Sequence, residues 1–526
     1  MFGRYLNILS RRRADNACEK NPAGYRDARR RGSPGIPPAI GLQDGASADG
    51  VAGDPTPPPT PGVTRRNMLA SSALAIAGGA LAASPQAWTD GPGIAVAPSS
   101  QRLSEHESKL RRALEARPLP PGLPDRDYLP VEAPNSGKIP FQIVDGVKVF
   151  HLVAMEVWNE FMPGLKALCR GYNGMVHPVL EAMEGERVRM YVTNRLPEAT
   201  TVHWHGLYVP NGMDGVGGLT QAPIPPGETF KYEFNLVEHG TKMFHAQYDE
   251  MTQIALGLTG LFVIHPRGPR RRVDRDFAIM LHEWRIAPGA YRPDPPAMTD
   301  FNVFTMNAKS FPATHPLVAR TGQRVRIRLG NLGPMDHHPI HLHNYSFNIV
   351  ATDGGDIPES AQQRETTVLV PVGTTQTIEF SATNPGDWAM HRPMTHHPMT
   401  QMGRHCGNMI GMKPGDLGRP VRRLPPDCMT MGPNDMPGMR RMPGEPNSQP
   451  MAGGKGPYGV IDRSGMFTIL KVRDGIKTYE DPGWYSPPPD TRADVAPHRG
   501  LRRDGVNPHV VPPVIAGPSS PAVAEG

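Results

Sequence analysis

The histidines of this chain fall at spacings that suit a metal ion. In an extended strand, residues two positions apart point to the same face, so His203-Trp204-His205 and His341-Leu342-His343 each place two imidazoles side by side. Copper and zinc ions need such neighbouring imidazoles, and a hydrophobic core does not. The candidate ligands of this kind are His203, His205, His245, His338, His341, His343, His391 and His397.

An internal repeat places these histidines at matching positions in two halves of the chain. Gly185-Glu186-Arg187-Val188-Arg189 recurs as Gly322-Gln323-Arg324-Val325-Arg326. Gly240-Thr241-Lys242-Met243-Phe244-His245 recurs as Gly386-Asp387-Trp388-Ala389-Met390-His391, and one His-x-His pair lies between the two matches in each half. A lone histidine is more often structural or solvent-facing, but histidines matched between two repeats indicate a common metal chemistry.

The elements that must carry these histidines read as short strands. The chain has 61 prolines and 57 glycines, and from about residue 138 its apolar runs are short and broken by Gly, Pro and Asn. This pattern is typical of β-sandwiches, so we expect an all-β fold with one sandwich per repeat. The expected divisions are a disordered leader at 1–63, a signal peptide at 64–87, a helix and linker at 88–135, sandwich domains at 136–268 and 273–415, and an irregular tail rich in Met, Pro and Gly at 416–526.

The signal peptide is predicted from an arginine pair and the apolar run that follows it. Arg65-Arg66 precedes the small-residue run Ala70–Ala83, which contains a cleavage-like Ala80-Leu81-Ala82. These features predict export by the twin-arginine route to the periplasm or cell envelope, with translation starting near Val63. The run is too short to anchor the chain, and no other segment is apolar enough, so we expect no membrane anchor.

Charge and cysteine content exclude two other classes of protein. The formal net charge is +6, and most of the excess of Lys and Arg lies in residues 1–66, so the remainder gives no reason to expect a nucleic-acid partner. Four cysteines are too few for a disulfide scaffold, although a Cys406–Cys428 bridge stays open in an exported protein.

The histidine motifs resemble those of multicopper oxidases. The similarity lies in His203-Trp204-His205-Gly206 with Asp214-Gly215, and in His338-Pro339-Ile340-His341-Leu342-His343. It extends from about residue 138 into the tail, where Gly456-Pro457-Tyr458-Gly459 and Lys471-Val472-Arg473-Asp474-Gly475 also match. The resemblance implies two cupredoxin-like Greek-key sandwiches, a type 1 copper that collects electrons, and a type 2/type 3 copper cluster that reduces dioxygen.

The resemblance also assigns roles to particular residues. The type 2 ligands that it implies are His203 and His341. The type 3 ligands are His205, His245, His343 and His391. The type 1 ligands are His338, His397 and Met402, while Asp214 would assist proton delivery near the cluster. Because only two sandwiches are expected, the cluster would form between the subunits of a homotrimer, with O2 and a small-molecule donor, phenolic or Cu(I), as reactants.

Three positions depart from the family pattern. The family reads His-Cys-His where this chain reads His391-Arg392-Pro393, and the matching position of the first repeat is Gln247. Type 1 copper needs the cysteine thiolate, and a guanidinium has no lone pair to offer a metal. We therefore expect the standard entry of electrons to be lost and each type 3 copper to keep two imidazoles instead of three. A replacement thiolate from Cys406 is an open but weak alternative.

Methionines crowd the segment from Met394 to Met451, and their thioethers could either bind Cu(I) or serve as flexible packing. Three functions therefore stay open. The chain is a copper-binding oxidoreductase with altered activity, a non-catalytic copper-binding or copper-tolerance protein, or an accessory subunit of a competent paralogue.

Overall fold

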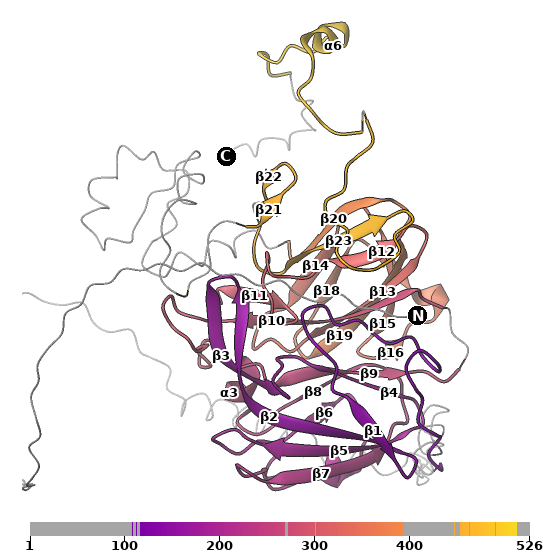
Figure 1. Ribbon diagram of the computed structural model, residues 1–526, viewed down its shortest axis with the longest axis vertical. Coiled ribbons are helices and arrows are strands. Elements are labelled where there is room, and N and C mark those ends of the chain that lie inside the picture. The colour runs from indigo at the N-terminus through magenta and orange to yellow at the C-terminus, as the bar shows by residue number, and fades with distance from the viewer. Residues whose placement is uncertain are drawn as a thin grey trace, which may run out of the picture. The chain divides into compact units, whose positions relative to one another are not determined.

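The computed structural model describes residues 108, 112, 116–268, 272–299, 301–393, 447, 453–461, 463–489 and 491–512 (Figure 1). Residues 1–99 lie outside the described residues. The predicted leader and signal peptide therefore have no structural description, and neither has most of the helix expected near residues 102–117. Among the helices of the described residues, none is long and apolar enough to cross a membrane.

The first repeat folds into two facing sheets. One sheet contains β1 (Phe141–Val144), β2 (Val147–Met162), β3 (Leu165–Tyr172), β5 (Arg187–Asn194) and β7 (Thr229–Asn235). The other contains β4 (Val179–Met183), β9 (Thr259–His265), β8 (Gly240–His245) and β6 (His203–His205). Residues of β5 alternate between partly and fully buried, as a strand with one core-facing side requires. Side chains from both sheets, such as Phe150, Trp204 and Phe262, meet in one hydrophobic core.

The second repeat forms another pair of sheets. The larger contains β10 (Arg275–Trp284), β11 (Val303–Met306), β13 (Arg324–Asn331), β15 (Phe347–Thr352), β16 (Gly355–Asp356), β17 (Gln363–Glu365) and β19 (Thr374–Ser381). The smaller contains β12 (Leu317–Arg320), β14 (His338–Leu342), β18 (Thr367–Val370), β20 (Gly386–His391) and β23 (Phe467–Arg473). The prediction of an all-β fold with two sandwiches is confirmed.

The remaining elements are short. They are α3 (Glu250–Ala255), α6 (His498–Arg503), the 3-10 turns η1 (Asn211–Met213) and η2 (Glu359–Ala361), and the hairpin of β21 (Lys455–Gly456) and β22 (Gly459–Val460).

One part of the predicted tail belongs to the second sandwich. Strand β23 pairs with β20 in antiparallel register and with β12 in parallel register, and it is buried along nearly its whole length. The expectation of an irregular segment is therefore wrong for residues 467–473. Apolar residues of β23 such as Leu470 and Val472 complete the core of this sandwich.

The two sandwiches pack against each other through the sheets that carry β8 and β10. Met243 and Leu261 of the first sandwich contact a hydrophobic cluster that includes Ala278 and Met280 of the second. Strand β10 is buried along its whole length, because alternate residues face its own core and the neighbouring sandwich. This packing places the metal-ligand candidates of β6 and β8 close to loops of the second sandwich.

A buried ion pair holds the segment before β1 onto the first sandwich. Lys148 and Glu186 are both fully buried, and Lys148 Nζ lies 3.0 Å from Glu186 Oε2. Lys148 also donates to the carbonyl of Gly122 at 3.0 Å, and Glu186 Oε1 accepts the Gly122 N–H at 2.6 Å. Two buried charges therefore satisfy each other and fix the backbone at Gly122.

Candidate metal centre

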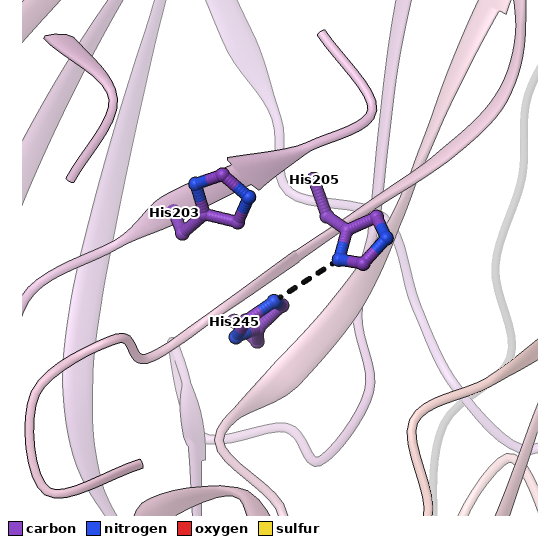
Figure 2. A group of neighbouring side chains, drawn as sticks. All are labelled: His203, His205 and His245. Atoms are coloured by element: carbon purple, nitrogen blue, oxygen red, sulfur yellow. Dashed lines mark hydrogen bonds between the residues drawn. The ribbon is translucent and has the colours of Figure 1, made fainter. Parts of the chain in front are cut away.

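Three histidines of the first sandwich converge at the end of its smaller sheet. His203 and His205 lie on β6, and His245 is the last residue of β8. In the antiparallel pairing of these strands, His203 lies directly opposite His245. Trp204 points into the core, so its two neighbours must face the other way. Figure 2 shows the three rings turned toward one another, with one ligand atom from each within 4.8 Å of the others. We call these residues the first triad.

Backbone carbonyls fix the orientation of the first triad. His203 Nδ1 lies 2.8 Å from the carbonyl oxygen of Asp214, and His245 Nδ1 lies 2.9 Å from that of Ala246. Each ring therefore donates its Nδ1–H to the backbone and keeps Nε2 as an acceptor. His205 presents Nδ1 to His245 Nε2 at 3.2 Å. Imidazoles held by such outer hydrogen bonds are typical of protein metal sites.

Burial keeps these imidazoles in the form that binds metals. It lowers the pKa of His245 to about 3, and burial together with His203 lowers the pKa of His205. A neutral imidazole has a lone pair for a metal ion, whereas an imidazolium has none. The first triad therefore has the donor atoms and the orientation that copper requires, and burial keeps His205 and His245 neutral.

The second sandwich brings three histidines together at the matching strand ends, and we call these residues the second triad. Among the described residues, only the first triad has a ligand atom from each histidine within 4.8 Å of the others, and His391 Nδ1 has no hydrogen-bond partner of the kind that His245 has. His341 lies on β14 opposite His391 at the end of β20, and His343 follows β14. His343 Nε2 lies 3.0 Å from His391 Nε2. His341 uses Nδ1 to contact the Thr366 carbonyl at 2.7 Å, which leaves its Nε2 for a ligand. The repeat found in the sequence therefore produces one three-histidine group in each sandwich.

Each triad lies near a different set of neighbours. Two groups of the second sandwich lie near His205. The carboxylate of Asp353 and the backbone of Gly373 both raise the pKa of His205, against the larger lowering by burial. His391 stacks on Phe467 of β23 with ring centroids 6.1 Å apart. In the part of the chain that the structure describes, no hydrogen bond or ring contact joins one triad to the other.

Two of the three positions that depart from the family pattern, Gln247 and Pro393, do not contribute ligands. The side-chain amide of Gln247 donates to Glu250 Oε2 at 2.7 Å. Pro393 is exposed and has no donor atom in its side chain. Each triad consequently has three imidazoles and no fourth from these positions.

Asp214 lies beside the first triad. Its carbonyl receives the hydrogen bond from His203, and its Oδ1 lies 3.4 Å from the same ring nitrogen. The residue directly follows η1, and Gly215 after it has φ of +87° with its Cα against the Val202 carbonyl. Any side chain at Gly215 would clash there, so the turn is fixed and Asp214 is held at His203.

The predicted type 1 site contains a buried cation instead of a thiolate. Arg392 is 7% exposed, and its NH2 group lies 3.2 Å from Asp336 Oδ2. Its guanidinium carbon lies 4.8 Å from the centre of the Phe304 ring. His338 is fully buried and donates from Nε2 to Glu283 Oε2 at 2.9 Å. A permanently charged guanidinium beside His338 does not fit a type 1 copper.

The other predicted type 1 ligands, His397 and Met402, lie outside the described residues, as do Cys406 and all the clustered methionines from Met394 to Met451. Their roles stay predictions from the sequence.

Two carboxylates at this pocket escaped the sequence analysis. Glu283 is fully buried on β10, and Asp336 precedes β14. A charged residue in Ala278-Ile279-Met280-Leu281-His282-Glu283-Trp284, a segment otherwise almost free of charge, was the signal that could have identified Glu283. No local pattern marks Asp336.

A third carboxyl group, Glu238, lies near the first triad and gives a prediction about pH. Its Oε1 accepts the backbone N–H of Tyr208 at 3.1 Å, and burial raises its pKa to about 7 despite nearby Lys242. Since the folded protein holds this proton more tightly than the unfolded chain, stability should fall as pH rises from about 4.5 to about 7. Glu238→Gln should remove that loss and be more stable than the wild type by about 2 kcal/mol at pH 8.

Urea unfolding of both proteins at pH 4.5 and pH 8 measures this difference. The exposed Glu228→Gln is the matched control and should leave the pH dependence unchanged. Equal stability of Glu238→Gln and wild type at both pH values would contradict the prediction.

Fold and site together define a protein with two β-sandwiches, each with three histidines at the matching strand ends, and with a candidate metal site in the first. Two family models, both described as multicopper oxidase, match residues 157–269 and 288–407. The chain therefore contains two multicopper oxidase domains, and such domains imply copper binding.

Individual relatives match over shorter stretches. Oxidoreductase OpS5 of Beauveria bassiana is 31% identical over 199 residues, covering 34% of this chain and 33% of the relative. Copper resistance protein A of Pseudomonas syringae pv. tomato is 38% identical over 112 residues, covering 21% and 18%. The matches thus span a third or less of these curated relatives. The blue copper oxidase from Nitrosomonas europaea is a similar solved structure, with 23% identity, a TM-score of 0.46, and coverage of 62% of this chain and 85% of that one.

Proposed function

We propose that this protein is an exported copper-binding oxidoreductase of the multicopper oxidase family that lacks the standard type 1 entry for electrons. One observation carries the proposal: the first sandwich has three imidazoles positioned for a metal and the second has three histidines at the matching strand ends, while Arg392 lies where the family has its cysteine. Copper bound at the triads would supply one-electron redox chemistry and a site for dioxygen.

The residues of the chain supply the rest of the site. Carbonyl groups of Asp214, Ala246 and Thr366 orient the imidazoles toward their ligand positions. The Asp214 carboxylate, 3.4 Å from His203 Nδ1, is close enough to exchange protons through water with a reactant at the first triad. In this proposal His203 and His341 are the type 2 ligands, and the other four triad histidines are type 3 ligands.

The reaction class follows from the family. We infer an O2-coupled one-electron oxidation of a phenolic or Cu(I) donor, slowed because no thiolate links a donor site to the triads. We also propose a homotrimer, since the two triads make no contact within the described part of one chain and a neighbouring subunit could bring them together. Export to the periplasm or cell envelope rests on the sequence around Arg65-Arg66.

Copper reconstitution tests the proposal. The purified mature chain is loaded with copper under controlled redox conditions, and bound metal per chain, the EPR spectrum and oxygen uptake with a phenol or Cu(I) are measured. We expect bound copper with a type 2 EPR signal and oxygen uptake well below that of an intact relative. A chain that binds no copper would overturn the proposal.

A second function stays in view because of the same departures from the family pattern. A non-catalytic copper-binding or copper-tolerance protein would bind copper at the triads and show no oxygen uptake. An accessory subunit would gain activity only when a competent paralogue is added. The two outcomes separate in the same experiment.

A further inference from the structure

The pocket around Arg392 contains one guanidinium cation and two carboxylates, Glu283 and Asp336. Glu283 is fully buried and accepts three hydrogen bonds, from the backbone of Met335 at 2.7 Å, from the backbone of Asp336 at 2.8 Å and from His338 at 2.9 Å. A buried carboxylate with this many donors is held in its charged form. It therefore needs a positive charge nearby to be stable in the protein interior.

Arg392 supplies that positive charge. Its side chain is 5% exposed, forms an ion pair with Asp336 and lies over the ring of Phe304. The negative charges of Asp336 and Glu283 both stabilise the charged form of Arg392. The same guanidinium NH2 group lies 3.5 Å from the carbonyl of His337, so it contacts the loop that precedes β14. Arg392 thus interacts electrostatically with both Glu283 and Asp336, and it contacts the loop that leads to His338.

We propose that the Arg392 guanidinium replaces the type 1 copper ion, so that the second sandwich reaches its stable form with no metal in this pocket. In this view the loss of the cysteine is compensated: a fixed organic cation takes over the charge balance that a bound copper ion would provide. His338 remains in place through Glu283, and its Nδ1 is buried with no hydrogen-bond partner among the described residues.

Two substitutions at the same position test the replacement. Arg392→Met keeps the length of the side chain and removes its charge, while Arg392→Cys removes the charge and adds a thiolate. Thermal unfolding is measured for the full mature chain, first with a chelator and then with copper. Without metal, both variants should unfold about 5–10 °C below the wild type, because the buried Glu283 and the partly buried Asp336 lose their cation.

Copper should separate the two variants. Added copper should return Arg392→Cys toward the wild-type unfolding temperature and produce the visible absorption of a copper–thiolate bond. Arg392→Met should gain only the shift that the triads give the wild type. Unchanged unfolding of Arg392→Met without metal would overturn the inference, and so would equal copper shifts for the two variants.

Two milder substitutions test the same role of charge if Arg392→Met or Arg392→Cys fails to fold. Asp336→Asn should lower the unfolding temperature by a few degrees, and Arg392→Lys should retain more stability than Arg392→Met because it keeps the charge. Arg392→Lys as unstable as Arg392→Met, or no loss in Asp336→Asn, would contradict the role of charge. Because the measurements without metal involve no triad copper, this inference can fail while the proposed copper function holds.

Discussion

His245→Ala should lower the copper affinity of the first triad by more than about 100-fold. Loss of an outer hydrogen-bond partner at a metal site costs about 10–100-fold, and His245 is a direct ligand candidate whose Nε2 faces His205 at 3.2 Å. Two imidazoles would then remain in place of three. Equilibrium dialysis with a competing chelator measures the affinity, and EPR shows whether the first-triad signal disappears.

The control for this variant is His151→Ala. His151 lies on the outer face of the first sandwich, exposed, where its Nε2 contacts Thr193 at 2.8 Å. The substitution His151→Ala removes one imidazole from the same sandwich and leaves the first triad intact, so copper binding should be unchanged. Equal copper affinity in His245→Ala and His151→Ala would show that the first triad is not a copper site.

Lys148→Met should lower the free energy of unfolding by about 3–5 kcal/mol. The substitution removes the nearer of two cations from the buried carboxylate of Glu186 and leaves only Arg267, whose NH2 group lies 3.8 Å from Oε1; removing one partner is the costly way to break a buried pair. The segment at Gly122 also loses a hydrogen bond from Lys148 Nζ. Denaturant unfolding of the metal-free chain measures the loss.

An exposed ion pair provides the comparison. Lys231 is half exposed and lies 3.5 Å from Glu233, so Lys231→Met should change stability by less than about 1 kcal/mol. Replacing both partners, as Lys148→Met with Glu186→Leu, should recover most of the loss because no buried charge remains unpaired. A loss in Lys148→Met no larger than in Lys231→Met would contradict this account.

Much of the fold was predictable because its signals are local. Alternation in Arg187–Val192 predicts a strand with one buried side, and β5 has that pattern. The His-x-His spacing predicts two imidazoles on one face, and the repeat predicts the histidine that pairs with them in each sandwich. These inferences need only strand geometry and sequence order.

The rest depends on contacts between residues far apart in the chain. Strand β23 has no histidine and no repeat match, and its pairing with β20 and β12 reveals its place in the sheet. Asp336 and Arg392 are 56 residues apart, and Glu283 and His338 are 55 apart. No periodicity links such pairs. The sequence therefore predicts that a thiolate is missing, and the structure shows which charges surround its replacement.

The central claim is that copper is held by histidine triads in a protein without type 1 copper. The most direct measurement records the visible absorption and EPR spectra of the copper-loaded wild-type chain together with its copper content. The account predicts bound copper, a type 2 EPR signal and no intense copper–thiolate absorption. An intense thiolate band, or a chain that stays free of copper, would contradict it.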